Sequence, residues 1–464
     1  MISIDGSAQS TLCIHTGTQV ALAGIVSDGD RCPTKNHNKS MALHPDSQIP
    51  ARASVFAPFS VRSFRMQWPA DLATSCAFEM ETIILGWYVL VETRSVLMLT
   101  LFASLQHMGT LLAPMFGVMG DRVGHRNVLA TMRAVYATLA LTLMTLAYSG
   151  LLTPTYVLFI ASVMGLIRPS DIGMRNALVG ATMPSDKLMS AMSIQRTTQD
   201  SAKVVGALSG AGLVALLGIG PAYTVVASFY ALSVVLTLKG ADSQAGPHPQ
   251  IAKSGRVSPW ADLREGVAYV WNTPLLLAAM CFAFLLNCTA FPMMGGLLPV
   301  MARQIYQTDQ TGLGYMVASA GFGALMSSVI ISRIGHTVRP ARAMIIFSAS
   351  WLVLLTLFAH TQHLAAGVAL LMMAGLSQGL GQIPMATMLI RNSEPQFRGR
   401  IMGIRMLAIY GNIPGLLLAG WLIKRIGYPM TATLYGALGL IFIVLVVSRW
   451  RAQLWLRDAP ANAQ

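Results

Sequence analysis

Residues 117–129 read GVMGDRVGHRNVL and lie between two long apolar segments of the chain. The stretch concentrates an aspartate, two arginines and a histidine between glycines. Glycine lets the backbone turn tightly, and ionised side chains avoid the membrane interior. The stretch therefore predicts a short polar hairpin that joins two membrane-spanning helices.

The composition agrees with a membrane protein. Hydrophobic residues make up 54% of the chain and charged residues 11%, whereas soluble domains carry roughly 25% charged residues. Apolar runs of membrane-spanning length recur between positions 70 and 450. The formal net charge of +14 falls in short loops between these runs, where cations set orientation rather than indicate nucleic acid. We predict an all-α membrane protein.

The apolar runs predict twelve transmembrane helices arranged as two six-helix bundles. The expected helices are 70–92, 95–117, 128–149, 155–180, 190–217, 220–239, 275–301, 311–333, 341–360, 363–390, 401–423 and 428–450.

The predicted organisation follows from these helices. Residues 1–62 are polar, lack a signal peptide and are expected to be a disordered cytoplasmic tail or the product of a mis-assigned start codon. The first bundle is 63–239 and the second 275–450. Between them, the linker 240–274 contains WADLREGVAYVW, which predicts a short amphipathic helix along the membrane surface. A cytoplasmic tail follows at 451–464.

The two halves resemble each other at an offset of about 210 residues, as expected of repeats related by an axis along the membrane normal. Basic residues gather in loops that follow even-numbered helices, which places both termini in the cytoplasm. These loops include Arg122, Arg126, Lys187, Arg256, Arg333, Arg339, Arg391 and Arg400.

The 117–129 loop resembles the loop between helices 2 and 3 of the major facilitator superfamily. Two further stretches, EPQFRGRIMGI (394–404) and the region 297–328, are similar to its enterobactin-exporter-like efflux branch. The resemblance implies a rocker-switch exporter, usually driven by proton antiport. Helix 5 departs from the exporter pattern because Gly206 and Gly210 lack the intervening proline.

The resemblance also implies that the loop is a conformational latch. Asp121 would contact the N-terminal end of helix 11 near 400–404, where a helix dipole favours an anion. Two glycines would permit close helix contact and a third the tight turn, while the arginines would bind at the cytoplasmic surface. The implied latch residues are Gly117, Gly120, Asp121, Arg122, Gly124, Arg126, Arg398 and Arg400.

Acidic side chains in the first predicted helix are costly inside a membrane. Asp71 and Glu79 lie on one polar stripe with Ser75, which is expected to line a central cavity. We interpret Glu79 as a protonatable coupling residue; the alternative is a structural ion pair. Glu81 lies on a more apolar face and is expected to pack against a neighbouring helix with a cationic partner.

The fourth helix carries Arg168, Asp171 and Arg175 on one face, which is expected to line the same substrate or proton cavity. On this face Asp171 can pair with either arginine. The arginine left over would serve the first helix or an anionic ligand. The fifth helix carries Arg196, Asp200 and Lys203, which are expected to pair internally as a structural group.

The second half offers amides rather than charges. Asn287, Gln378 and Gln382 are expected to face the cavity among phenylalanine and methionine side chains, a wall that suits a large, partly hydrophobic substrate. Ordinary helix packing, with amides bonding across helices, is the alternative.

These features predict a secondary transporter, namely a proton-coupled exporter of a small amphipathic molecule such as a drug, siderophore or metabolite. An organic-anion importer and a non-transporting sensor or scaffold on the same fold are the alternatives. We expect a monomer in the cytoplasmic (inner) membrane, with small-molecule substrate and protons as partners and no nucleic acid. The sequence predicts no enzyme activity, catalytic residue, metal site or cofactor.

Overall fold

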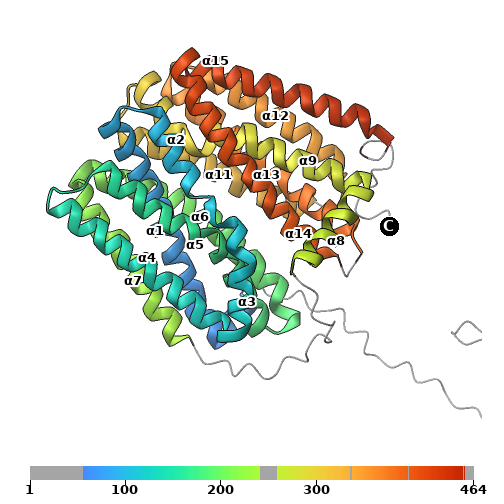
Figure 1. Cartoon of the computed structure of the whole chain (residues 1–464), viewed down its shortest axis with the longest axis horizontal. Helices are drawn as coiled ribbons and strands as arrows, with labels where there is room; N and C mark the ends of the chain where they lie inside the picture. The colour runs from blue at the N-terminus through green and yellow to red at the C-terminus, as the bar shows by residue number, and fades with distance from the viewer. Residues whose placement is uncertain (1–55, 241–258, 335–336, 395–396, 453, 455–464) are drawn as a thin grey trace, which may run out of the picture. The chain divides into compact units, whose positions relative to one another are not determined.

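The computed structural model describes residues 56–240, 259–334, 337–394, 397–452 and 454. Within these ranges the regular structure is helical, and ten helices are long and apolar enough to cross a membrane (Figure 1). The predicted all-α membrane fold is confirmed. Most of both predicted tails lies outside the described residues.

The structure has α-helices joined by short turns. The first half comprises α1 (Arg62–Thr93), α2 (Val96–Leu105), α3 (Ala113–Val123), α4 (His125–Tyr148), α5 (Pro154–Thr182), α6 (Ser185–Leu217) and α7 (Ile219–Lys239). The linker helix is α8 (Pro259–Asn272), and the second half comprises α9 (Pro274–Phe291), α10 (Leu298–Val300), α11 (Gln310–Ile334), α12 (Pro340–His360), α13 (Leu364–Arg391), α14 (Arg398–Leu407) and α15 (Asn412–Arg449). The amphipathic segment predicted in the linker is helical, as α8.

The second predicted helix, 95–117, is not continuous. α2 ends at Leu105, a 3-10 helix η2 (Met108–Leu112) follows, and α3 begins at Ala113. Pro114 explains the break, because proline has no N–H to donate to the preceding turn and disfavours helix in the residue before it. The prediction of one unbroken helix was therefore wrong.

The eleventh predicted helix, 401–423, is interrupted in the same way. α14 is followed by a 3-10 helix η5 (Ala408–Gly411) and then by α15, with Pro414 in the first turn of α15. α15 itself turns at Gly427, whose φ of 79° and ψ of 166° are not helical, between the predicted helices 401–423 and 428–450. Two of the predicted helices are interrupted, and parts of the last two are joined as α15. The count of twelve transmembrane helices therefore stays a prediction.

Small residues bring the helices close together. α1 packs against α6 and α7, and α6 also packs against α11 of the second half. A Cβ added at Gly210 of α6 would lie 2.8 Å from Met80 Cα of α1. Gly206 and Gly210 thus allow α1 and α6 to pack closely.

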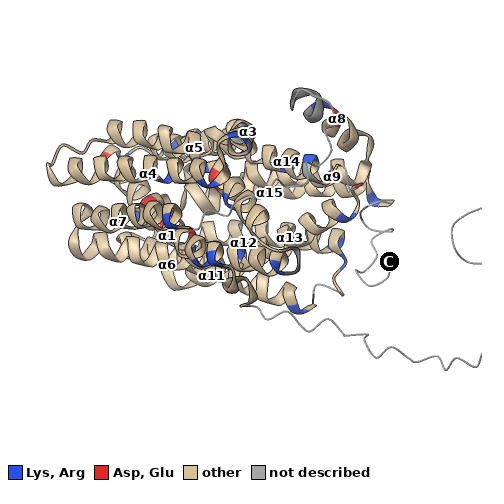
Figure 2. Ribbon diagram, turned by 90° about the horizontal axis from the view of Figure 1, so that it is seen from below, with Lys and Arg blue, Asp and Glu red and all other residues tan. Residues whose placement is uncertain are grey.

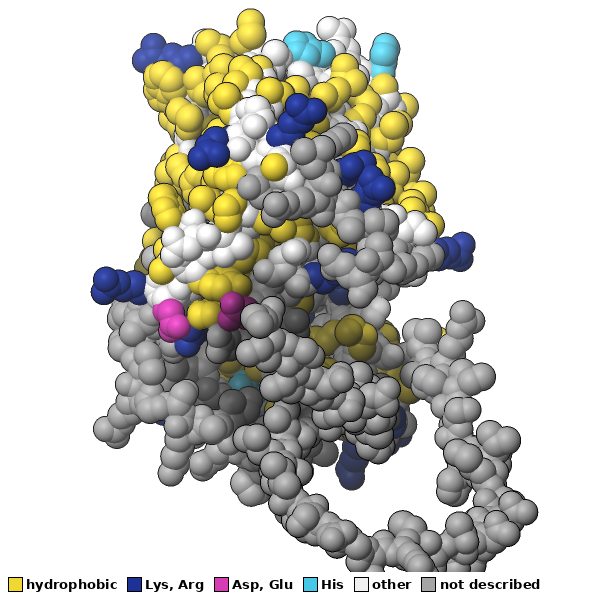
Figure 3. All heavy atoms as spheres, turned by 90° about the vertical axis from the view of Figure 1, so that its right-hand side faces the viewer, with side chains coloured by type: hydrophobic (Ala, Val, Ile, Leu, Met, Phe, Trp, Pro, Cys, Tyr) yellow, Lys and Arg dark blue, Asp and Glu magenta, His cyan; other side chains and the backbone are white. Residues whose placement is uncertain are grey.

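The outer surface suits a lipid environment. Large apolar side chains such as Phe159, Leu216 and Leu445 are more than half exposed, and Figure 3 shows one face where hydrophobic side chains dominate the described surface. Acidic and basic side chains are sparse along the helices (Figure 2). A water-soluble protein would not expose so much apolar surface. Charged side chains are costly inside a membrane-embedded fold, so those found inside it need a separate explanation.

Candidate functional site

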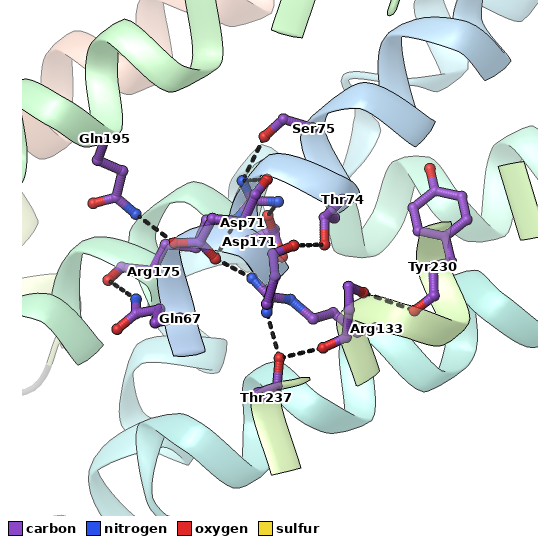
Figure 4. Close-up of polar contacts among 12 residues, drawn as sticks. Gln67, Asp71, Thr74, Ser75, Arg133, Asp171, Arg175, Gln195, Tyr230 and Thr237 are labelled. Carbon is purple, nitrogen blue, oxygen red and sulfur yellow. Dashed lines mark hydrogen bonds and ion pairs between the residues drawn. The ribbon is translucent and has the colours of Figure 1, made fainter. Parts of the chain in front are cut away.

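Asp71 of α1 is the centre of a buried charged network in the first half (Figure 4). Its Oδ1 forms an ion pair with Arg133 Nη2 of α4 and lies 3.7 Å from Arg175 Nε of α5. Gln195 of α6 donates to Asp71 Oδ2 at 3.1 Å. One carboxylate therefore joins four helices.

Arg175 extends the network along α5 and back to α1. Its Nη2 lies 2.5 Å from Asp171 Oδ2, and its Nη1 donates to Ser75 Oγ at 2.8 Å and to the Asp71 carbonyl at 3.3 Å. Of the two partners that the sequence allowed for Asp171, the structure selects Arg175, and Arg168 is the arginine left over.

Arg133 was missed by the sequence analysis. The residue is 0% exposed and also donates to Thr237 Oγ1 of α7. The available signal was an arginine inside the apolar run 128–149, since a cation at such a place needs a partner. With Arg133 included, the negative charges of Asp71 and Asp171 are balanced by the positive charges of Arg133 and Arg175. Removing one member would leave a buried charge without a partner, which is strongly unfavourable.

Asp71, Asp171 and Arg175 were expected to line a cavity, but each is at most 5% exposed in this conformation. They face one another inside the first half. Their arrangement can hold α1, α4, α5 and α6 together, while their direct contact with a substrate remains a prediction.

Arg168 lies apart from that network and binds only neutral acceptors. Its Nη1 donates to Gln106 Oε1 at 2.6 Å, and its Nη2 donates to the Phe78 carbonyl at 3.1 Å and to Thr82 Oγ1 at 3.0 Å. The guanidinium also lies over the Phe78 ring. Among the described residues no carboxylate lies within ion-pair distance of it, so its positive charge is available to a mobile anionic group.

Glu79 and Glu81, near the middle of α1, have different surroundings. Glu81 is 3% exposed and accepts a hydrogen bond of 3.0 Å from the Tyr230 hydroxyl of α7. The expectation that it packs against a neighbouring helix is confirmed, but the predicted cationic partner was wrong. The Tyr230 hydroxyl donates a hydrogen bond to the Glu81 carboxylate, as the N–H group of a cation would. The nearby Arg168 donates to Gln106 and not to Glu81.

Glu79 is half-buried, and its carboxylate has no hydrogen bond or ion pair to any residue the structure describes. α6 passes close by, since a Cβ added at Gly206 would lie 2.8 Å from Glu79 Cβ. Of Asp71, Glu79 and Glu81 on α1, Glu79 is therefore the one whose carboxylate is not held by a described residue.

Arg196, Asp200 and Lys203 of α6 pair internally, as predicted. Arg196 Nε lies 3.0 Å from Asp200 Oδ2, and Lys203 Nζ lies 3.7 Å from Asp200 Oδ1. The Asp200 side chain is 1% exposed, whereas those of Arg196 and Lys203 are 62% and 43% exposed. The aspartate is fixed in the protein and both cations reach outward.

The amides of the second half are only partly as expected. Asn287 is buried and donates to the Ala283 carbonyl of its own helix at 2.8 Å. Gln378 and Gln382 are partly exposed, and Gln382 Oε1 accepts from Arg405 Nη2 of α14 at 3.2 Å. The sequence analysis did not consider Arg405, a cation near the start of the eleventh predicted helix.

The 117–129 loop forms the predicted turn. α3 ends at Val123, Gly124 has a φ of 95°, and α4 begins at once. A Cβ at Gly120 would lie 3.1 Å from Met174, so close contact there is confirmed. Among the described residues no atom lies within 4 Å of a Cβ added at Gly117, so the close contact expected there stays a prediction.

The latch itself is described only in part. Arg122 is exposed, and Arg126 Nη1 donates to the Gly240 carbonyl at 3.2 Å. Arg400 Nη1 forms an ion pair of 2.7 Å with Glu265 of α8. The side chains of Asp121 and Arg398 lie outside the described residues, so the contact of Asp121 with 400–404 stays a prediction.

Comparisons with known proteins point to one family. The sequence pattern described as Major Facilitator Superfamily matches residues 72–411 and 280–462. The "Multi-drug resistance efflux pump PmrA" of Streptococcus pneumoniae is 24% identical over 238 residues, which cover 51% of this chain and 56% of that pump. The chain thus spans little more than half the length of that relative.

Two further likenesses cover more of the chain. The "Multidrug resistance protein MdtG" of a Rahnella species is 24% identical over 380 residues, or 79% of this chain and 88% of that protein. Among solved structures, a variant of the nucleoside transporter NupG matches with a TM-score of 0.62 and 15% identity over 84% of this chain and 100% of that one. The structural likeness concerns the fold.

Proposed function

Because the chain belongs to the Major Facilitator Superfamily, a family of membrane transporters, we propose that it is a proton-coupled exporter of a small amphipathic molecule. Its substrate would be a drug, siderophore or other metabolite, carried by alternating access between the two halves. The multi-pass membrane fold is the premise; direction, coupling ion and substrate class are what is proposed.

The state of Glu79 carries the proposal of proton coupling. The described aspartates and glutamates that are buried in the first half, namely Asp71, Glu81, Asp171 and Asp200, each have a hydrogen bond or an ion pair. Glu79 has neither and is partly exposed within a membrane-spanning helix. A carboxylate that is not held in place can take up a proton in one conformation and release it in another, as antiport requires.

The composition of the second half supports an amphipathic substrate. Trp351 donates to the Met294 sulfur at 3.3 Å, and Phe291 packs edge-on against the same tryptophan. Methionine side chains adapt to varied apolar shapes, and Gln382 and Arg405 form a polar contact elsewhere in the same half. Two of the relatives reported above are named as multidrug efflux proteins.

We place the transporter in the cytoplasmic membrane with both termini in the cytoplasm and propose that it acts as a monomer. The basic loops after even-numbered segments support this orientation. Asp121 and its neighbours would then stabilise one global state from the cytoplasmic side.

Arg168 favours a second candidate, the import of an organic anion. Its guanidinium binds only neutral groups among the described residues, so an anionic substrate would be its first carboxylate or phosphate partner. Arg175, which the sequence also offered for this role, is already paired with Asp171 and Asp71.

Transport by the purified protein in proteoliposomes discriminates the two candidates. The probes are ethidium, a cationic amphipathic dye, and fluorescein, an organic anion. Proton-coupled export predicts that ethidium moves in the direction opposite to protons flowing down their gradient. Collapsing the gradient with an ionophore should abolish ethidium accumulation. Movement of fluorescein alone, unaffected by the gradient, would favour the anion carrier and contradict the proposal.

A further inference from the structure

We propose that Lys203 of α6 is a positioning residue for proton coupling, and that its ammonium moves between Asp200 of its own helix and Glu79 of α1. The inference rests on the proposed role of Glu79. When Glu79 releases its proton to water, Lys203 swings to the carboxylate. When Glu79 takes up a proton, Lys203 returns to Asp200.

Lys203 is only loosely held by its present partner. The distance of 3.7 Å between Lys203 Nζ and Asp200 Oδ1 is too long for a hydrogen bond, and Asp200 Oδ1 has no hydrogen-bond partner among the described residues. Arg196 binds the other oxygen at 3.0 Å and compensates the charge of Asp200. Lys203 can therefore leave Asp200 without exposing an unpaired buried carboxylate.

The path from Lys203 to Glu79 is short because α1 and α6 are in close contact. Gly206 follows Lys203 by three residues and lies on the same side of the helix. A Cβ at Gly206 would meet Glu79 Cβ at 2.8 Å and the Cys76 carbonyl at 3.0 Å. The flexible four-carbon stem of lysine can span one turn of a helix.

Lys203 is also the mobile cation among the charged groups that act on Glu79. The other charged or titratable groups near the Glu79 carboxylate are Arg168 of α5, Asp200 of α6 and the Cys76 thiol of α1. Arg168 is fixed by three hydrogen bonds.

Of the neighbouring helices, α7 and α11 place no further charged side chain against Glu79 among the described residues. α7 directs Tyr230 at Glu81 rather than at Glu79. α11 brings Gly314 and Gly321 against α6 at this level. A swing of Lys203 would therefore be governed by the two carboxylates, Asp200 and Glu79.

The contact with α11 connects this movement to transport. A Cβ at Gly321 would lie 3.3 Å from Lys203 Cβ and 3.1 Å from Val204 Cγ2. The Cβ of Lys203 thus lies at the contact between α6 and α11, which belong to different halves. Any sliding of α11 along α6 changes the space open to the lysine stem, so each position of the halves can favour one of the two carboxylates.

The test is the pH midpoint of the Glu79 carboxylic-acid band, measured by infrared difference spectroscopy on the full chain in lipid nanodiscs. The band is assigned by its loss in Glu79→Gln. Removing a neighbouring cation favours the protonated carboxyl, so Lys203→Met and Lys203→Gln should both move the midpoint to higher pH by roughly 1 unit or more. Lys203→Arg should restore most of the wild-type midpoint.

Lys187→Gln is the matched control, because it removes a lysine of the same helix that donates to Ser60 Oγ and takes no part in the Asp200 group. An unchanged midpoint in both neutral Lys203 variants, or an equal shift in Lys187→Gln, overturns the role of Lys203 while leaving proton coupling through Glu79 intact. A wild-type protein without a titrating Glu79 band would instead overturn the proposed coupling itself. Size-exclusion profiles confirm that each variant is folded.

Discussion

His107 Nε2 and Asn412 Nδ2 lie 3.1 Å apart and join the two halves of the chain at their interrupted helices. The other ring nitrogen of His107 faces the Ala103 carbonyl at 3.0 Å. A carbonyl only accepts, so Nδ1 carries the hydrogen and Nε2 of the neutral ring accepts from the asparagine. Beside this pair, the Tyr410 hydroxyl donates to the Met108 carbonyl at 3.0 Å.

This contact predicts a shift in conformation when it is removed. The double variant Tyr410→Phe, Asn412→Ala deletes both hydrogen bonds between the 3-10 turns and should reduce the population of the state described here. Distance distributions between spin labels on α2 and α15 would measure it, with Thr433→Ala, at the contact with His360 within the second half, as control. Identical distributions in wild type and double variant would show that the contact does not stabilise this state.

Arg133→Gln should be the most destabilising single change in the charged network. It removes the arginine that lies closest to the Asp71 carboxylate. Breaking a buried ion pair typically costs about 3–5 kcal/mol. Thermal stability of the detergent-solubilised protein, followed by size exclusion, would report the loss, with the exposed Arg122→Gln as control. Adding Asp71→Asn should recover part of the stability, whereas strictly additive losses would argue against a direct pair.

Two glycines of the first half should respond differently to alanine. In Gly206→Ala the new Cβ would clash with Glu79 Cβ and the Cys76 carbonyl, so α1 and α6 must separate at a cost of about 1–3 kcal/mol. In Gly117→Ala the methyl group meets nothing within 4 Å. Equal stability of the two variants would contradict the close approach of α1 and α6.

Asp121→Asn should leave insertion and abundance nearly intact and reduce transport. The aspartate is proposed to stabilise one global state through the end of the eleventh segment, and losing that interaction shifts the population between states. Ethidium export per unit of membrane protein would measure the effect. Wild-type export rates in this variant would exclude the latch role.

The sequence was sufficient to predict the membrane helices and most helix ends. Apolar length marks a span, and Gly124 and Gly427 mark turns that only a residue tolerant of positive φ makes easily. It did not predict the breaks before Pro114 and Pro414, because a proline inside an apolar run is compatible with either a bend or an interruption, and packing decides between them.

The candidate site was harder to predict because spacing places residues on a face but does not identify their partners. The stripe of Asp71, Ser75 and Glu79 is real along α1, yet its first two members are bound by Arg175 and only the third is left without a partner. The partner of Asp71 on α4, Arg133, comes from another part of the sequence. The tyrosine that binds Glu81, by contrast, gave no sequence signal, since tyrosines are common in membrane proteins.

The central claim is that Glu79 couples proton movement to transport, and the direct measurement is ethidium-dependent proton movement in proteoliposomes, reported by an enclosed pH-sensitive dye. Glu79→Gln keeps the shape of the side chain and removes its titration, so it should abolish proton movement and gradient-driven accumulation while ethidium exchange at equilibrium persists. Glu81→Gln should retain coupling and mainly lower thermal stability, because its partner is Tyr230 inside the fold. Undiminished proton movement in Glu79→Gln, or its loss in Glu81→Gln alone, would contradict the account.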